Sequence, residues 1–368
     1  MIMKINNYKG RYRVVSLAFD DTVKDDLKKD GLDFLYIGEK SVTLYPDNLI
    51  IIDNQEEIDC LKCAHNYDVY ELYDDGRLVE YYDDTSLDNY FFVTAKCNSN
   101  CVMCPSPEAV RKSGLNSDVD NLIEIAKHIP IDTKHLTITG GEPFMVGEDI
   151  FRFFDFLKHK YEDTEFLFLT NGRVFAIESY VQRFIDTLPN YSIVAIPIHG
   201  SSEETHDAIS QVKNSFNQTI RGIKTLLKNK IRVEVRIVVS KLNAEELTDI
   251  AKLITREIPK VEYVSIMAME MTGSARINKD MVWIPYTDAG KYAGEAAYVL
   301  LKNGIDVKLY NFPLCSVKSE LWPLCEKSIS PEKVRYSEVC NLCRMREACG
   351  GVFAGTINME KGELKAIL

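Results

Sequence analysis

The feature that most constrains the fold is a sixfold alternation of short β-rich runs and helical stretches between about residues 89 and 270. Each run is rich in aromatic and β-branched residues, which is typical of strands, and the intervals show helical periodicity. Strands that alternate with helices predict a parallel sheet of βα units. The six strand candidates are residues 90–95, 135–139, 165–170, 192–198, 232–239 and 261–268.

The alternation alone leaves the topology open. Right-handed crossovers between six parallel strands build either a doubly wound sheet or an open partial barrel. In a parallel barrel the reactive groups lie at the C-terminal ends of the strands. Side chains that directly follow the strand candidates are therefore the first candidates for a functional site.

Three closely spaced cysteines follow the first strand candidate, in the pattern C-x3-C-x2-C. They are Cys97, Cys101 and Cys104. A 4Fe-4S cluster is normally held by four thiolates, so a loop with three leaves one iron free for a ligand that is not a cysteine. A zinc site and a chance spacing are the alternatives.

A second motif, Gly140-Gly141-Glu142-Pro143, follows the second strand candidate. Two glycines let a backbone pass close to a ligand where a side chain would clash, and a proline stiffens the exit from the turn. Both motifs thus fall at predicted strand ends.

Three further strand ends carry polar residues that we expect near a cofactor or substrate: Asn171, His199 and Arg236. Asn171 could instead serve a helix cap or a turn. Arg236 alternates with apolar neighbours, so its side chain faces into the barrel or toward solvent. From inside the barrel it could pair with a carboxylate.

Five of the ten cysteines lie in the last part of the chain, after a helix predicted at 283–303 and a strand candidate at 307–310. Three of them form a C-x2-C-x5-C loop that could converge on one metal centre: Cys340, Cys343 and Cys349. We predict Cys315 as the fourth ligand because it follows the strand candidate, and Cys325 is the competitor. A 4Fe-4S cluster is favoured, and structural zinc is the alternative.

Composition limits the class of protein. The chain has 368 residues, of which 46% are hydrophobic, enough for a barrel-sized domain with appended modules. A net charge of -11 argues against a nucleic-acid partner. No secretion signal is evident, and no apolar run approaches the ~18 residues that span a bilayer. We therefore expect no membrane partner, a cytoplasmic location, and cysteines that serve as metal ligands or free thiols.

The two motifs at the strand ends resemble the radical SAM superfamily. The resemblance implies a partial (β/α)6 barrel, a 4Fe-4S cluster on the first three cysteines and S-adenosyl-L-methionine on the free iron. It also implies an external low-potential electron donor and a 5'-deoxyadenosyl radical that abstracts hydrogen from the substrate. Contacts to the methionine amino group or the adenine are implied for Gly140, Gly141, Glu142, Pro143 and Met103.

The cysteine-rich tail resembles the SPASM and twitch extensions of peptide-modifying radical SAM enzymes, which carry auxiliary 4Fe-4S clusters. No cysteine follows Cys349, so the tail departs from the full SPASM pattern and supports one auxiliary cluster. Longer stretches resemble the C-type radical SAM maturases of His-Xaa-Ser peptide systems, namely residues 196–199, 269–276, 310–315, 321–323 and 349–354. This implies maturation of a ribosomally made precursor peptide, with a second maturase subunit as a further partner.

We therefore predict three parts: an N-terminal α+β domain over 1–86, a radical SAM partial barrel over 87–280 and an auxiliary-cluster extension over 281–368. The competing functions are a radical SAM enzyme that acts on a small metabolite and a non-enzymatic zinc protein. The pair Cys60 and Cys63 in the N-terminal part is expected to be structural thiols. The modified residue, the bond formed and the oligomeric state do not follow from the sequence.

Overall fold

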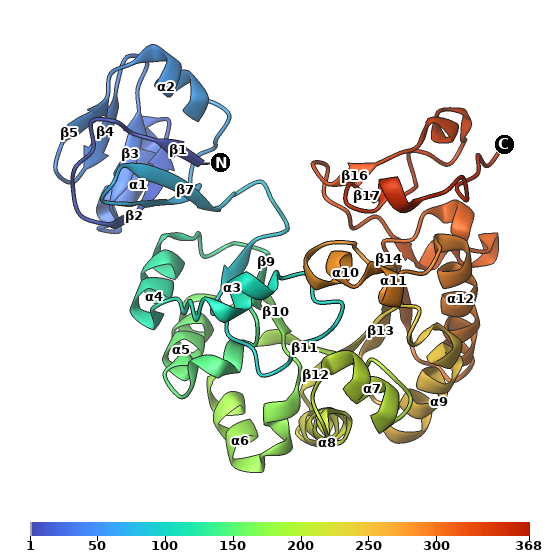
Figure 1. Ribbon diagram of the computed structural model, residues 1–368. Helices are drawn as coiled ribbons and strands as arrows, with labels where there is room; N and C mark the ends of the chain where they lie inside the picture. Colours follow the sequence, from blue (N-terminus) through green and yellow to red (C-terminus); the bar gives the residue numbers. More distant parts are fainter. Residues whose placement is uncertain (1) are drawn as a thin grey trace.

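The computed structural model describes residues 2–368, so only Met1 of the predicted N-terminal domain lies outside the described residues. It has an N-terminal domain, a curled parallel sheet with helices on its convex side, and a cysteine-rich extension (Figure 1). The N-terminal domain is α+β, as predicted. Its elements are β1 (Ile2–Lys4), β2 (Arg13–Ala18), α1 (Asp21–Lys29), β3 (Phe34–Ile37), β4 (Val42–Tyr45), β5 (Leu49–Ile52), α2 (Gln55–Leu61), β6 (Val69–Leu72) and β7 (Arg77–Tyr82).

The central sheet has eight parallel strands in the order β15-β14-β13-β12-β11-β10-β9-β8. Six of them confirm the six strand candidates. The candidate at 307–310 is also a strand, and it extends the same sheet past the predicted domain boundary at 280. The strands are β8 (Tyr90–Phe92), β9 (His135–Thr139), β10 (Glu165–Leu169), β11 (Tyr191–Pro197), β12 (Arg232–Val238), β13 (Tyr263–Met267), β14 (Val307–Tyr310) and β15 (Cys325–Glu326).

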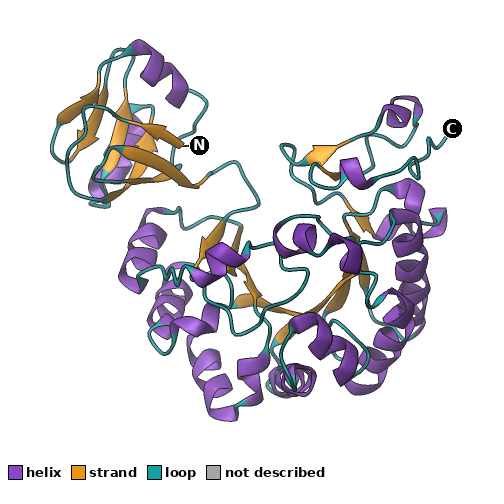
Figure 2. Ribbon diagram, viewed as in Figure 1, coloured by secondary structure: helices purple, strands orange, loops and turns teal. Residues whose placement is uncertain are grey.

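Helices cover the convex face of this sheet and leave its concave face open (Figure 2). This arrangement is the partial barrel rather than the doubly wound sheet, in which helices cover both faces. The longer helices are α4 (Val119–His128), α5 (Ile150–Lys160), α6 (Glu178–Thr187), α7 (Glu203–Ser210), α8 (Ser215–Lys228), α9 (Leu247–Glu257) and α12 (Tyr286–Lys302). The short ones are α3 (Glu108–Lys112), α10 (Gly273–Ile277) and α11 (Lys279–Val282).

Helix α5 shows why the sheet is covered on one side. Its apolar residues recur at helical spacing, and Ile150, Phe153, Phe154 and Leu157 are fully buried against the sheet. The Phe154 ring meets Phe168 of β10 edge to face, with ring centroids 5.1 Å apart. Such pairs add roughly 0.5–1.5 kcal/mol to the burial of their area. The packed side of the sheet is thus rigid, and the open side is free for a site.

The extension after β14 consists mainly of loops. It contains the two-stranded sheet of β16 (Val334–Arg335) and β17 (Val352–Phe353). Within the described residues, seven short 3-10 helices interrupt the loops, at Pro143–Val146, Arg173–Ala176, Ala244–Glu246, Leu314–Ser316, Ser319–Leu324, Glu338–Leu342 and Ile357–Met359. Within residues 2–368, none of the helices has the length and apolarity that crossing a membrane requires.

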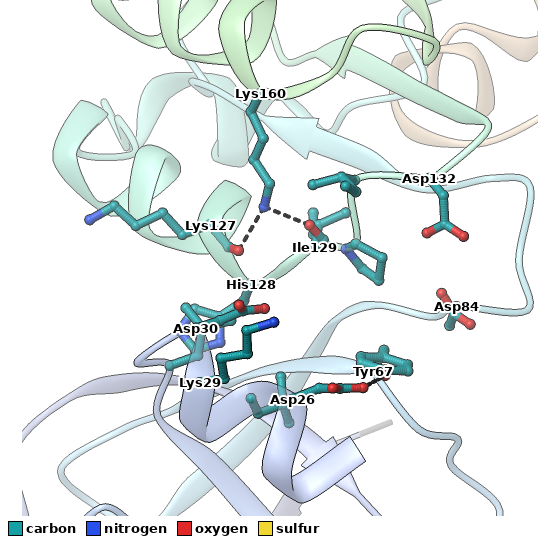
Figure 3. A pocket seen from close by; sticks show the side chains of 14 residues that line it. Asp26, Lys29, Asp30, Tyr67, Asp84, Lys127, His128, Ile129, Asp132 and Lys160 are labelled. Carbon is teal, nitrogen blue, oxygen red and sulfur yellow. Dashed lines mark hydrogen bonds between the residues drawn. The ribbon is translucent and has the colours of Figure 1, made fainter. Parts of the chain in front are cut away.

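A cavity of ≈ 460 Å³ lies where the N-terminal domain meets the barrel, between α1 and the end of α4 (Figure 3). Lys160 reaches into this junction, and its ammonium donates to the carbonyls of Ala126, Lys127 and Ile129 at 2.5–2.7 Å. These carbonyls end helix α4, so Lys160 caps the helix. None of the residues that line this cavity is a cysteine.

The buried His128 at this junction should make the protein sensitive to acid. Its Nδ1 lies 2.9 Å from the Ser16 hydroxyl, and burial lowers its pKa to about 4 despite the favourable charge of Asp33. As the pH falls from about 6.5 toward 4, His128 becomes protonated in the unfolded chain but stays neutral in the folded protein. This difference lowers the free energy of unfolding by up to about 3 kcal/mol.

We expect His128→Gln to flatten the fall in unfolding free energy between pH 7.5 and 4.5, measured by urea denaturation. His159→Gln is the matched control because the side chain of His159 is 73% exposed. Equal pH dependence in the two variants would contradict this role of His128.

Candidate functional site

The three cysteines of the first motif lie together on the loop that leaves β8. Their sulfurs are close together: beside the larger effect of burial, the charge of Cys104 raises the pKa of Cys97 and of Cys101, and that of Cys97 raises the pKa of Cys101. Burial is the larger effect, and it raises the pKa of Cys101 to about 12. The Ser99 N–H donates to Cys97 Sγ at 3.4 Å. The pKa values of Cys97 and Cys101 are thus raised, and a bound cation would stabilise their thiolates.

Hydrogen bonds with three other segments hold this loop in place. The Val102 N–H donates to Ile209 O at 3.0 Å, and the Ser274 N–H donates to Cys104 O at 2.8 Å. The Arg173 guanidinium donates to Asn98 O at 2.9 Å. The loop is thus positioned before anything binds to it.

The two glycines of the second motif let its backbone form hydrogen bonds with the residues that lead into the cysteine loop. The Gly141 N–H donates to Thr94 O at 2.7 Å, and the Glu142 N–H donates to Lys96 O at 2.8 Å. A Cβ at Gly141 would lie 2.4 Å from the carbonyl oxygen of Lys96. The glycines therefore allow the backbones of the two motifs to pair.

The Glu142 carboxylate joins the ends of two strands. It accepts hydrogen bonds from the Asn171 N–H at 2.7 Å and from the Thr170 hydroxyl at 2.8 Å. Burial raises its pKa, and these donors partly offset the rise. Neither Glu142 nor Pro143 lines the cavity beside the cysteines. The structure thus gives the Glu142 side chain a positioning role. Of the four residues of the motif, Gly140 and Gly141 line the cavity and remain candidates for the predicted cofactor contact.

A cavity of ≈ 310 Å³ opens beside the cysteine loop at the C-terminal ends of the strands. This volume lies at the lower end of small-molecule sites, which span roughly 300–1,000 Å³. The structure brings nine of the predicted residues together in its lining: Cys97, Cys101, Cys104, Met103, Gly140, Gly141, Asn171, His199 and Arg236.

Two neutral histidines present polar groups at this cavity. The His199 N–H donates to His206 Nδ1 at 3.1 Å, so the neutral ring of His206 carries its proton on Nε2. Burial lowers the pKa of His199 to about 3 and that of His206 to about 4. Nδ1 of His199 is buried and has no hydrogen-bond partner within residues 2–368. Buried polar atoms are nearly always satisfied, so this nitrogen fits a cavity that receives a polar ligand.

Arg236 faces the concave side of the sheet, one of the two orientations left open by the sequence. Its guanidinium is already paired with Glu234, at 2.8 Å from Nε to Oε1. Glu234 is 1% exposed and also accepts from the Tyr263 hydroxyl at 3.2 Å. A carboxylate ligand would therefore have to share Arg236 with Glu234.

Sequence reasoning missed Glu234, Arg173 and His206. Glu234 and Arg236 stand two apart on a strand, which places them on one face, and that spacing could have indicated the pair. Arg173 follows Asn171 at a strand end, where functional residues were expected. His206 carried no signal in the sequence, because its contact to His199 depends on how α7 packs.

The tail cysteines also gather. The thiolates of Cys349 and Cys340 both raise the pKa of Cys315, whereas only Cys349 among the cysteines does so for Cys325. Burial raises the pKa of Cys325 to about 12. Cys315 is thus close to two members of the C-x2-C-x5-C loop, and Cys325 to one.

Backbone N–H groups point at the sulfurs of this tail group. Cys349 Sγ accepts from the Leu314 and Gly351 N–H groups, both at 3.4 Å, and Cys343 Sγ accepts from the Ile367 N–H at 3.4 Å. Hydrogen bonds to cysteine sulfur are one of the means by which proteins tune iron-sulfur clusters.

The sulfurs of the tail can be compared with the spacing that a single zinc ion requires. Zinc holds thiolates at about 2.3 Å, which places their sulfurs about 3.8 Å apart. In the described part of the chain, the one group of three side chains whose ligand atoms lie within 4.8 Å of one another is His65, Asp68 and Asp83. Within residues 2–368, no three cysteine sulfurs approach so closely. Cys60 and Cys63 are both exposed and belong to neither group.

Comparison with known proteins agrees with this geometry. Residues 91–254 match the family model described as the radical SAM superfamily. The chain is 28% identical over 178 residues to an AdoMet-dependent heme synthase of Methanosarcina barkeri, a match that covers 46% of this chain and 47% of that protein. The chain therefore spans about half the length of this curated relative.

Two solved structures share the fold to different extents. Streptococcus suis SuiB bound to its precursor peptide SuiA aligns with a TM-score of 0.50 and 13% identity, over 78% of this chain and 60% of SuiB. The protein anSMEcpe, with bound AdoMet and a peptide, aligns with a TM-score of 0.46 and 18% identity, over 60% of this chain and 62% of its own. By the family model, residues 91–254 form a radical SAM domain, set between an N-terminal α+β domain and a cysteine-rich extension.

Proposed function

We propose that this protein is a radical SAM enzyme that modifies a ribosomally made precursor peptide. The observation that carries the proposal is the loop of three half-buried cysteines beside a cavity at the strand ends. Cys97, Cys101 and Cys104 would hold a 4Fe-4S cluster, which together with S-adenosylmethionine would supply radical chemistry through reductive cleavage of the cofactor.

The residues of the chain would position the reactants and exclude water. Asn171, His199 and His206 offer neutral polar groups to the adenosylmethionine or the substrate. Glu142 and Arg173 hold the strand ends and the cysteine loop at a fixed distance, so little reorganisation is needed on binding. The tail cysteines Cys315, Cys340, Cys343 and Cys349 would hold an auxiliary cluster that accepts an electron from the substrate or anchors it.

The concave face of the sheet offers room for a peptide segment. A second cavity of ≈ 720 Å³ runs along this face. It meets the cavity beside the cysteines at four shared residues, Thr139, Leu169, Arg236 and Met267. A side chain bound in the second cavity could therefore reach the first without leaving the barrel.

The charge of the N-terminal domain supports a peptide partner. Residues 1–86 hold 19 acidic and 10 basic side chains of the chain's 55 and 44, which gives -9 of the total charge of -11. An acidic module joined to a nearly neutral barrel favours association with a cationic segment. The resemblance to His-Xaa-Ser maturases supports a precursor with His-Xaa-Ser repeats.

The test is co-expression with a co-encoded precursor that carries His-Xaa-Ser repeats, followed by mass spectrometry. We expect a loss of hydrogens that depends on the three cysteines of the first loop, as a ring closed between side chains requires. All neighbouring genes should be included because a second maturase subunit belongs to the proposal. An unmodified precursor under these conditions would contradict the peptide assignment.

The second candidate function is radical SAM chemistry on a small molecule. The match to an AdoMet-dependent heme synthase favours it, since that protein is named for a product that is not a peptide. Turnover of a tetrapyrrole or another metabolite, together with an unmodified precursor, would support this alternative.

A further inference from the structure

A groove of ≈ 720 Å³ lies away from the cofactor cavity, where the C-terminal extension meets the barrel. Its walls come from the loop after β12, from α11, from the residues that enter α12 and from the segment 358–363. It shares no lining residue with the cavity beside the first cysteine loop. A partner in this groove would therefore leave the path to that cavity open.

Three lysines line this groove, Lys241, Lys279 and Lys361. All three are exposed, and none of them forms an ion pair within 4.0 Å in the described residues. The groove also holds two carboxylates. Asp280 is exposed, and Glu363 accepts the N–H of Thr287 at 3.0 Å. The lysine groove, as we call this surface, thus carries an excess of positive charge on a chain of net charge -11.

The floor of the lysine groove is apolar and touches the cysteine loop. Trp283 and Met359 line the groove and pack against a buried apolar cluster that contains Val102 and Met103. These two residues stand between Cys101 and Cys104. The groove floor and the cysteine loop therefore contribute to the same apolar cluster.

Hydrogen bonds join the wall of the groove to the same loop. The Asn278 side chain, next to Lys279, donates to Val102 O at 2.8 Å. The Lys241 N–H donates to Val282 O at 2.9 Å, which ties the loop after β12 to α11. A protein seated in the groove would thus rest on residues that directly support the first three cysteines.

We propose that the lysine groove is the docking surface for an acidic electron-donor protein that reduces the cluster held by Cys97, Cys101 and Cys104. This inference rests on the proposed function. In the step, the reduced donor gives up one electron, the oxidised cluster takes it up, and no bond or proton changes. Lysine charges steer an acidic partner to the groove, and the apolar cluster that packs against the groove floor includes Val102 and Met103 of the cysteine loop.

The test compares two reductants on full-length protein with its clusters reconstituted. We replace the three groove lysines together, as Lys241→Glu, Lys279→Glu and Lys361→Glu. The matched control reverses three exposed lysines elsewhere, as Lys40→Glu, Lys213→Glu and Lys302→Glu. Formation of 5'-deoxyadenosine is measured with dithionite and with a reduced flavodoxin of net negative charge as the probe donor.

We expect the groove variant to raise the KM for flavodoxin by roughly tenfold or more and to weaken its dependence on salt. Turnover with dithionite should stay unchanged, and the control variant should resemble the wild type. Replacement of the same lysines by arginine should keep the KM for flavodoxin. A direct binding measurement should show the same loss of flavodoxin affinity in the groove variant alone.

Three outcomes would overturn the docking surface: an unchanged KM and affinity in the groove variant, an equal effect in the control variant, or an equal loss with dithionite. Failure of the proposed function gives a different result, because wild-type protein would then form no 5'-deoxyadenosine with dithionite. Even in that case the affinity of flavodoxin for the wild type and the groove variant still decides whether the groove binds an acidic protein.

Discussion

Replacing Cys97, Cys101 and Cys104 together by alanine is expected to reduce the cleavage of S-adenosylmethionine to background. The three sulfurs line one cavity, and no other cysteine lies in its lining. Loss of all three thiolates removes every protein ligand of the cluster at that cavity. The measurement is 5'-deoxyadenosine formed under anaerobic conditions with dithionite.

The same variant should keep its tail metal, which makes the result specific. Reconstituted wild-type protein should hold on the order of eight irons, and the triple variant about four, by the rule of four irons per cluster. Unchanged 5'-deoxyadenosine in the triple variant would contradict the cluster assignment. Four irons with stoichiometric zinc in the wild type would instead remove the auxiliary cluster.

The second large effect is expected in the tail, where Cys315→Ser should lose the auxiliary iron and Cys325→Ser should keep it. Cys315 lies near both Cys340 and Cys349, and Cys325 lies near Cys349 alone among those cysteines. Iron analysis and electronic absorption spectra of the two variants measure the difference.

Cys325→Ser is itself the matched control, because both cysteines are half-buried in the same extension. S-adenosylmethionine cleavage should continue in both variants, since the first cysteine loop lies in another segment. If Cys325→Ser loses the tail iron and Cys315→Ser retains it, the assignment of the fourth ligand is wrong.

Local patterns in the sequence were sufficient for the strands and for the two cysteine groups. A strand candidate such as 135–139 appears as β9 with the same bounds, because apolar and β-branched residues between polar stretches leave few other structures. The first candidate, 90–95, is shorter in the structure. Its strand ends at Phe92 because Ala95 donates its N–H to Leu115 instead of to β9.

The sequence did not indicate which partners the polar side chains of the site would bind. The structure turns the Glu142 carboxylate to the strand ends and pairs Arg236 with the buried Glu234. Both outcomes depend on which donors lie within about 3 Å after packing, and spacing along the chain carries no such distances. The extent of the sheet was also left open, because β14 and β15 join it only through pairing with distant residues.

The sequence by itself determined the parallel βα architecture and the three-cysteine loop, since both follow from local periodicity and ligand spacing. Only the tertiary structure decided that helices cover one face of the sheet and leave the other open. It also decided that the tail folds back to place Met359 beside Trp283, against the residues next to the cysteines. The physical reason is that contacts between residues far apart in the chain arise from packing, which one-dimensional patterns do not contain.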